Sequence, residues 1–417
     1  MRQATCTDAS LLSAPVPNKP VVAPYRMNEL EVTLGFVLGS PRLADEPPLR
    51  RGATPLQVLV GGLRETLSHG PCLVSFSGGR DSSALLAVAL DTARREGLPE
   101  PVALTLRYPG IATADESAWQ ELVVRHLGVA EWERVLIDPP SSEILGPVAS
   151  ASLRERGLLW PPALHLSAAW LQRAKGATIL TGEGGDEVFG PHRAAAMHFL
   201  ARTLLRRPAK LRPALLKTVA GSVAPKPLRV RAARKDLVNN GALAWLRSPL
   251  RELALTEIAE LSAQEPWPAA KALRDHLNEP ALLIGEANRT WLAAFYGARF
   301  VHPFLDSGFV EAVARDGGRW GYTSRTEAMS RIFGAFLPEA VITRKTKARF
   351  NEAVHGHLTR AFATNWDGTG VDRACVDVDT LRSLWLDEFV PAGTTALLQA
   401  AWLACGSPAL DEAGAAQ

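Results

Sequence analysis

The stretch Ser75-Phe76-Ser77-Gly78-Gly79-Arg80-Asp81-Ser82-Ser83 decides which fold the rest of the sequence must form. It closes a short apolar run, Cys72–Phe76, and opens a segment with apolar residues at helical spacing, Ser82–Arg94. This pattern predicts a buried strand, a tight turn and a helix. Adjacent glycines let the backbone N–H groups approach an anion, and the positive end of the helix points at the same place. No Gly-Lys-Ser/Thr follows, so the stretch is not a Walker loop.

Strand and helix patterns alternate on both sides of this stretch. Predicted strands are Cys72–Phe76, Val102–Leu106, Glu133–Ile137 and Thr178–Leu180, and predicted helices are Leu56–Leu67, Ser82–Arg94, Ser117–Leu127 and Leu164–Lys175. Such alternation predicts an α/β fold with a doubly wound parallel sheet that is covered on both faces. Ligands of such sheets bind at the carboxyl ends of the strands. A second glycine-rich turn, Thr181–Asp186, also follows a strand.

The two ends of the chain differ from this central part. Four prolines between residues 15 and 24 break any early helix, and we expect an N-terminal arm or hairpin over residues 1–55, with a strand at Glu31–Leu38, or else disorder. Strand signals disappear beyond about residue 190, which predicts a mostly helical C-terminal lobe. Its predicted helices are Ala194–Leu205, Leu243–Leu261, Pro268–His276, Ala281–Tyr296, Phe309–Arg315, Thr326–Phe336, Thr380–Phe389 and Thr394–Cys405. We therefore divide the chain into an arm (1–55), an α/β core (56–200) and a helical lobe (201–417).

Composition excludes several classes of protein. Hydrophobic residues make up 47% of the 417 residues, which is too many for a disordered chain, and the net charge of +3 is too small to indicate a nucleic-acid binder. Four scattered cysteines, no apolar run of about 18 residues and no secretory signal lead us to expect a cytoplasmic protein without a membrane span. The histidines show no metal-ligand spacing.

The first stretch resembles the pyrophosphate-binding loop of the ATP pyrophosphatases, which cleave ATP between its α and β phosphates. The resemblance implies an adenine nucleotide α-hydrolase-like fold, with ATP and Mg²⁺ as cofactors. It also implies that Asp81 binds Mg²⁺ and that pyrophosphate is held by Ser77, Gly78, Gly79, Ser82 and Ser83. The alternative is a tight strand-to-helix turn without a ligand, which needs one glycine but not this whole pattern.

The second turn, Thr181-Gly182-Glu183-Gly184-Gly185-Asp186, is similar to the matching stretch of asparagine synthetases and their relatives. The resemblance implies that Asp186 is a second Mg²⁺ ligand and that Gly182 and Gly184 belong to the nucleotide site. Glu183 is then expected beside the activated carboxyl group, where it orients that group or accepts a proton. A glycine-rich turn with solvated acids is the alternative.

Three later stretches extend the resemblance over roughly residues 56–405. Tyr108-Pro109-Gly110 with Ala114–Ser117 implies that Phe76 and Leu106 flank the nucleoside, although both residues could equally belong to the core. His302–Asp306 resembles an architectural Pro-Phe-Leu-Asp turn. Arg344–Phe350 resembles a basic Lys-x-x-Phe segment, which implies that Lys347, or less directly Lys345, stabilises phosphate charge; a solvated basic loop is the alternative.

The departures from the family bear on the substrate. Glutamine-dependent asparagine synthetases carry a cysteine nucleophile at position 2 in a glutaminase domain, whereas this chain has Arg2 and only about 55 residues before the core. We expect no glutamine hydrolysis, so the nitrogen comes from ammonia, a partner or the substrate itself. Arg299 stands where asparagine synthetases usually have a glutamate, which disfavours aspartate as the substrate.

The segments Thr105–Gly110 and Asp115–Gln120 look closest to synthetases of peptide natural-product clusters such as lasso-peptide cyclases. The resemblance implies an ATP-dependent amide-forming ligase that adenylates a carboxylate, releases pyrophosphate and AMP, and forms a macrolactam. Its partners would be a precursor peptide or a small carboxylic acid, and a leader-peptide-binding or protease protein. Ammonia-dependent amidation of a small carboxylic acid is the alternative. A tRNA-modifying enzyme and a non-catalytic scaffold are disfavoured.

One stretch has an unusual charge. From Val188 to Lys235 the chain has no Asp or Glu but many Lys and Arg residues. The stretch is interpreted as a solvated helical edge, or alternatively as a strap that docks an acidic partner. Nucleic acid is disfavoured because aromatic residues for base stacking are nearly absent.

Overall fold

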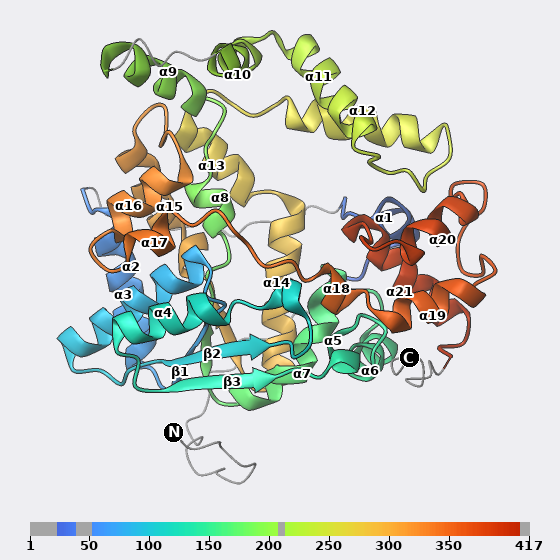
Figure 1. Ribbon diagram of the computed structural model, residues 1–417, viewed down its shortest axis with the longest axis horizontal. Coiled ribbons are helices and arrows are strands. Elements are labelled where there is room, and N and C mark those ends of the chain that lie inside the picture. The colour runs from blue at the N-terminus through green and yellow to red at the C-terminus, as the bar shows by residue number, and fades with distance from the viewer. Residues whose placement is uncertain (1–22, 39–51, 207–212, 409–417) are drawn as a thin grey trace.

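The centre of the molecule is a five-stranded parallel sheet in the order β3-β2-β1-β4-β5 (Figure 1). The structure is a computed structural model that describes residues 23–38, 52–206 and 213–408. The strands are β1 (Cys72–Ser75), β2 (Val102–Arg107), β3 (Trp132–Leu136), β4 (Thr178–Leu180) and β5 (Arg299–Val301), and every neighbouring pair is parallel. The predicted doubly wound α/β fold is confirmed, with the first four strands where the sequence placed them.

Both faces of the sheet are buried because successive side chains of a strand point to opposite sides. In β1, Val74 packs into a core with helices α2 (Pro55–Ser68) and α3 (Arg80–Glu96). Its neighbour Leu73 packs into a second core that contains residues of α14 (Pro280–Phe295). The sheet is therefore enclosed, and its ligand-accessible groups lie at the carboxyl ends of its strands.

The fifth strand corrects the prediction that no strand occurs beyond about residue 190. β5 pairs with β4 through Leu180↔Val301, so the sheet takes its last strand from inside the C-terminal part of the chain. The strand has three residues, which is too short to show an alternation of polar and apolar side chains. Its pairing with β4, rather than its own sequence, makes it a strand.

The remaining helices cover the sheet or build the C-terminal lobe. They are α1 (Glu29–Leu34), α4 (Ser117–Leu127), α5 (Pro139–Ser142), α6 (Pro147–Arg156), α7 (Ala168–Leu171), α8 (Gly185–Phe189), α9 (Ala195–Arg206), α10 (Pro213–Val223), α11 (Lys226–Asn239), α12 (Leu250–Ser262), α13 (Ala269–Leu277), α15 (Ser307–Gly317), α16 (Arg325–Phe333), α17 (Glu339–Ile342), α18 (Asn351–Val354), α19 (His357–Asn365), α20 (Val378–Leu386) and α21 (Thr395–Ala404). Short 3-10 helices connect several of them.

The strand predicted at Glu31–Leu38 is wrong, because this segment contains helix α1. Asn28 caps the helix: its side chain accepts from the N–H of Glu31, and the Glu31 carboxylate accepts from the N–H of Asn28. Gly35 then ends the helix in the left-handed conformation. Val32 and Leu34 pack into the core of the C-terminal lobe. Most of the predicted arm, residues 1–22 and 39–51, lies outside the described residues.

Two predicted helices are also shorter than expected. The segment Leu164–Lys175 is divided among a 3-10 helix at Pro162–Ser167, α7 and a further 3-10 helix at Gln172–Ala174. The helix predicted from Leu243 begins only at Leu250. Pro249 precedes that first helical residue, and a proline disfavours helical backbone in the residue before it.

Helices α9 to α12 form an arch, defined here as residues 195–206 and 213–262, which runs along the top of the molecule in Figure 1. The segments that flank the arch meet, since the backbone N–H of Arg193 donates to the Glu265 carboxylate at 2.8 Å. Its far part contacts the C-terminal lobe, where Leu246 forms a bridge with Val376. Within the described residues, no helix is long and apolar enough to cross a membrane.

Candidate active site

The first glycine-rich turn is a loop at the end of β1 that gathers several hydrogen-bond donors. The Ser77 and Ser82 hydroxyls are 3.0 Å apart, and the backbone N–H of Ser77 donates to Ser82 Oγ at 3.2 Å. Gly78 has a φ of +82°, which favours glycine. Helix α3 starts directly after Gly79 without a side-chain cap, so its first N–H groups are left for a ligand.

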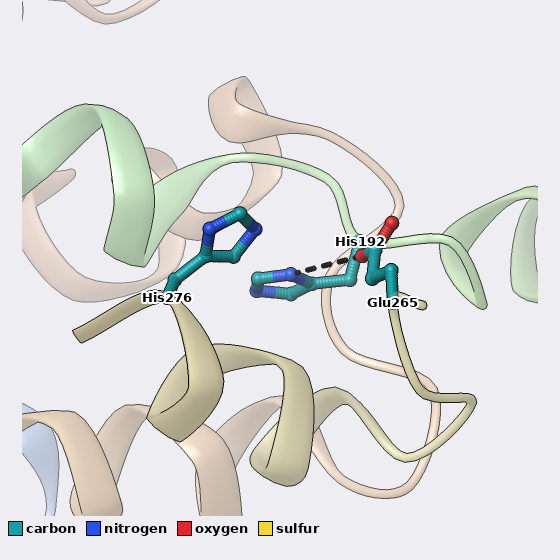
Figure 2. Close-up of side chains that lie close together, drawn as sticks. All are labelled: His192, Glu265 and His276. Carbon is teal, nitrogen blue, oxygen red and sulfur yellow. Dashed lines mark ion pairs between the residues drawn. The ribbon is translucent and has the colours of Figure 1, made fainter. Parts of the chain in front are cut away.

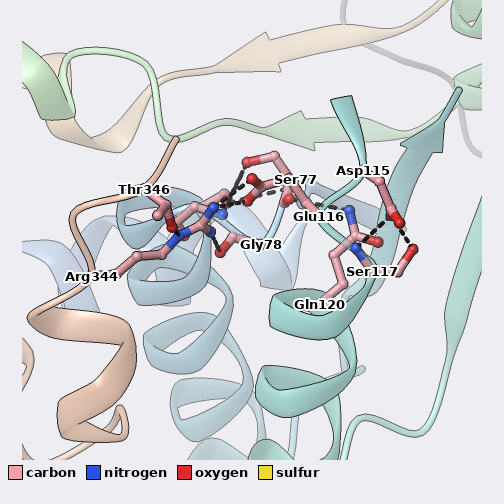
Figure 3. Close-up of polar contacts among 10 residues, drawn as sticks. Ser77, Gly78, Asp115, Glu116, Ser117, Gln120, Arg344 and Thr346 are labelled. Atoms are coloured by element: carbon pink, nitrogen blue, oxygen red, sulfur yellow. Dashed lines mark hydrogen bonds and ion pairs between the residues drawn. The ribbon is translucent and has the colours of Figure 1, made fainter. Parts of the chain in front are cut away.

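A buried ion pair fastens this turn to the basic segment near residue 347 (Figure 3). Arg344 pairs with Glu116, and their side chains are only 3% and 9% exposed. Arg344 also donates to the Gly78 carbonyl at 3.0 Å and lies over the ring of Trp119. The amide of Gln120 donates to the Ser77 carbonyl at 3.2 Å. The shape of the turn therefore depends on residues from two other segments.

The second glycine-rich turn places Asp186 close to Asp81 of the first turn. Arg325, at the start of α16, forms ion pairs with both Asp81 and Asp186. Lys347 Nζ lies 3.0 Å from the other carboxylate oxygen of Asp186. Gly185 is required for this approach, because a Cβ at that position would lie 2.4 Å from the Asp81 carboxyl carbon. Asp81, Asp186 and Lys347 thus meet around one guanidinium group.

The two aspartates fit a magnesium ion. Asp81 Oδ1 is buried and has no hydrogen-bond partner among the described residues, although its other oxygen contacts Arg325. A buried carboxylate oxygen without a partner is rare, and an ion that binds there is one explanation for it. Carboxylate oxygens are the hard donors that Mg²⁺ prefers, and one or two of them are usual beside phosphates. Asp81 and Asp186 are therefore the residues that would hold it.

Glu183 lines the same cavity as the two aspartates and has a basic partner. Its Oε1 lies 2.8 Å from Arg289 Nη2, which comes from α14. Glu286 lies close to both groups. Burial raises the pKa of Glu286, Arg289 opposes the rise, and the Glu183 carboxylate adds to it. The end of β4 therefore carries a small acid–base group in addition to the magnesium ligands.

Glu183, the two aspartates and Lys347 share a cavity of about 410 Å³ at the carboxyl ends of β1 and β4. Of the predicted site residues, it is lined by Ser77, Gly79, Asp81, Ser82, Gly182, Glu183, Asp186, Lys345 and Lys347. Arg80, Arg325 and Arg344 line it as well. Burial lowers the pKa of Arg80, and the neighbouring guanidinium groups of Arg325 and Arg344 lower it further. So many cations in one cavity suit a polyphosphate.

The other predicted residues lie around this cavity. The Ser83 hydroxyl is buried, and Gly78 and Gly184 shape the two turns through positive φ angles. The Phe76 side chain lies in the hydrophobic core, the second of its two alternatives. Leu106 lines an adjacent cavity of about 250 Å³, and Phe350 lines both cavities. A place for the nucleoside beside Leu106 stays a prediction.

Sequence reasoning missed Arg325 and did not single out Arg344, Glu116 or Gln120. The contact between Arg325 and Asp81 joins residues 244 positions apart, so no local spacing reveals it. Arg344 belongs to the basic segment that was recognised, but the sequence gives no sign that it is buried. Glu116, nine residues after the end of β2, is equally indistinguishable from a surface residue by pattern.

The fold and the site define an ATP-dependent ligase that forms carbon–nitrogen bonds. The model of the asparagine synthase family matches residues 63–400, and the chain belongs to that family. Membership implies activation of a carboxylate as its adenylate, and members of the family generally use ATP and Mg²⁺. No curated protein matched the chain in a sequence comparison.

Proposed function

We propose that this enzyme adenylates a carboxyl group of a peptide and joins it to an amine of the same peptide, so that a macrolactam forms. The observation that carries the proposal is the convergence of Asp81, Asp186 and Lys347 in one cavity beside Glu183. A carboxylate oxygen attacks the α-phosphorus of ATP, and the bond to the pyrophosphate breaks. The amine then attacks the acyl carbon, loses a proton, and AMP leaves.

The chain's own residues account for the first step. The N–H groups at the start of α3 and the hydroxyls of Ser77 and Ser82 bind the departing pyrophosphate. Lys347 and Arg325 stabilise the charge that develops on it, and such oriented cations often supply the largest catalytic contribution. Asp81 and Asp186 would hold Mg²⁺, which when bound screens the phosphate charges.

The second step, the attack of the amine, depends on residues at the end of β4. Glu183 lies beside the magnesium ligands and is held by Arg289 at 2.8 Å, which fixes the direction of its carboxylate. In this position it accepts the proton that the attacking amine loses. Holding the amine and the acyl group together in one cavity lowers the barrier by converting a bimolecular step into an intramolecular one.

Exposure of the site favours a peptide over a small acid. The Lys347 side chain is 81% exposed and that of Asp186 is 54% exposed, so a long substrate can reach the phosphate site. Arg299, which replaces the glutamate of asparagine synthetases, lies on the edge strand and lines another cavity. Residue 299 does not line the ATP cavity, so its identity does not decide between a peptide and free aspartate. The likeness of Thr105–Gly110 to peptide-cyclising synthetases supports the same choice.

The test is ATP–pyrophosphate exchange with a panel of carboxylates: peptides with a free N-terminal amine and an internal Asp or Glu, the same peptides acetylated at the N-terminus, and free aspartate. We expect exchange with both forms of a peptide, but loss of one water, detected by mass spectrometry, only with the free amine. Release of ADP and phosphate contradicts the proposal. Asparagine formed from aspartate and ammonium favours the alternative, ammonia-dependent amidation.

The Asp186→Asn variant provides the control for this assay. We expect it to abolish exchange and AMP release, because one of the two magnesium ligands loses its charge, while its circular dichroism spectrum stays that of the wild type. Undiminished turnover in this variant contradicts the role of Asp186.

A further inference from the structure

Three side chains from separate segments meet shortly after the end of α8 (Figure 2). His192 follows α8, Glu265 precedes α13, and His276 lies near the end of α13. One ligand atom from each lies within 4.8 Å of the other two. We propose that His192, Glu265 and His276 form a binding site for one divalent transition-metal ion of the zinc type.

His192 is the buried member of the group. Its side chain is 6% exposed, and Nδ1 lies 3.6 Å from Glu265 Oε1. Ligand atoms around a tetrahedral zinc ion lie about 3.3 Å apart, given bond lengths of about 2.0–2.1 Å, so only a small adjustment is required. Its Nε2 is also buried and has no hydrogen-bond partner among the described residues. Figure 2 shows its ring between the other two side chains.

His276 already has the partner that a metal-bound histidine needs. Its Nδ1 lies 2.7 Å from the Glu279 carboxylate, one turn along the chain. A neutral ring that donates from Nδ1 keeps the lone pair of Nε2 for a metal ion. Metal-binding histidines commonly use their second nitrogen in this way, which fixes the tautomer and the orientation of the ring. The His192 and His276 ring centres are 6.1 Å apart.

Glu265 supplies the negative charge. Burial by itself raises the pKa of this carboxyl group, but the neighbouring His192 ring and the hydrogen bond from the backbone N–H of Arg193 outweigh that effect and lower it. Two imidazoles and one carboxylate are a donor set that zinc uses when a fourth position is left for water. Magnesium and calcium prefer sites made of oxygen ligands alone, so nitrogen donors favour a transition metal.

The site lies where the arch leaves and rejoins the rest of the molecule. His192 precedes the arch and Glu265 follows it, and Arg193 donates to the Glu265 carbonyl at 3.2 Å and to the Ser222 carbonyl at 2.6 Å. A metal ion bound to both segments and to α13 would hold the two ends of the arch against that helix. We therefore expect zinc binding to slow the local unfolding of the segments that flank the arch, residues 192–197 and 263–266.

The experiment uses the full chain without an affinity tag, treated with a chelator and then titrated with Zn²⁺ in a calorimeter. We expect one equivalent to bind to the wild type. His276→Ala should weaken the affinity at least tenfold, and Glu279→Gln should weaken it about 10–100-fold because it removes the orienting carboxylate. His126→Ala is the matched control: the ring of this exposed histidine forms a hydrogen bond with the Phe336 carbonyl and is not part of the cluster, so the affinity should not change.

Hydrogen exchange measures the structural effect separately. Zn²⁺ should slow amide exchange at residues 192–197 and 263–266 in the wild type and in His126→Ala, but not in His276→Ala. The His276 side chain is 40% exposed, so its loss should leave the fold intact, and an unchanged unfolding midpoint without metal checks this. Zinc affinity that is equal in the wild type and in His276→Ala, or no binding to the wild type, overturns the proposal.

Discussion

At the scale of single residues, Arg325 is the contact between the two halves of the catalytic site. It pairs with Asp81 and Asp186, which come from different strand ends. We predict that Arg325→Gln lowers the rate of pyrophosphate release about 100-fold, because one oriented cation beside the leaving group is lost. Arg331→Gln is the control, since it lies on the same helix but pairs with Asp316. Equal rates in the two variants contradict the prediction.

Arg344 stabilises the fold as well as the site. We predict that Arg344→Met lowers the free energy of unfolding by about 3–5 kcal/mol, because Glu116 is then left buried without its partner. The double variant Arg344→Met/Glu116→Leu should recover part of this loss, since no buried charge remains. Urea unfolding measures both values. A double variant that is no more stable than the single one contradicts this account.

The sequence was informative about residues whose role depends on a local motif. Asp81, Asp186 and Lys347 each occupy a recognisable position in a turn or basic segment, and the structure brings all three together. Arg325 could not be predicted, since its position is set by how α16 packs. His192, Glu265 and His276 are likewise far apart in the chain, which explains why the expectation of no metal-ligand pattern missed their proximity.

At the scale of elements, the two glycine-rich turns pack so closely that no side-chain atom fits between them at Gly185. We predict that Gly185→Ala displaces Asp81, because the added Cβ would lie 2.4 Å from its carboxyl carbon. The variant should lose magnesium-dependent exchange activity and about 1–3 kcal/mol of stability. Gly61→Ala in α2 meets no atom within 4 Å and should keep full activity. Activity assays and urea unfolding on both variants measure the difference.

Helices and strands with a clear spacing of apolar residues could be predicted from the sequence. Those that form only through contacts with neighbouring elements could not. β1 and α3 follow from the apolar run and the helical spacing around the first turn. β5 forms because its backbone pairs with the edge of β4. α1 was mistaken for a strand because a short apolar segment fits both patterns, and only the Asn28 cap decides for a helix.

The acid-free stretch acquires part of its balancing charge from other elements. Arg202 pairs with Glu327 of α16, Arg234 pairs with Glu252 of α12, and Lys226 Nζ lies 3.9 Å from Glu260. This supports the interpretation as a solvated helical edge for the residues that pair in this way. Docking of an acidic partner on the rest of the stretch stays a prediction.

At the scale of the whole molecule, buried histidines make the fold sensitive to acid. Burial lowers the pKa of His165, His302 and His355 to about 4, against 6.5 in an exposed side chain. Between pH 6.5 and 4 the unfolded chain therefore binds more protons than the folded one, so these groups lower the free energy of unfolding as the pH falls. Glu143 and Glu286, whose pKa values are raised by burial, act in the opposite direction.

A comparison with one variant isolates the histidine effect. We predict that the free energy of unfolding of His165→Gln falls less steeply between pH 6.5 and 4.5 than that of the wild type. His165 is fully buried, with Nδ1 2.9 Å from the Ser152 hydroxyl, so glutamine can keep a hydrogen bond but cannot be protonated there. Urea titrations at several pH values give the two slopes. Identical slopes contradict the prediction.

Because β5 is synthesised long after β4, the sheet stays incomplete during part of translation. β4 ends at residue 180, but its partner β5 begins only at residue 299. At a translation rate of about 5–20 residues per second, a ribosome needs on the order of ten seconds to cover that interval. During this time the nascent chain presents the bare edge of β4, and a bare strand edge pairs readily with other chains. Chaperone occupancy during synthesis should therefore be greatest before β5 emerges.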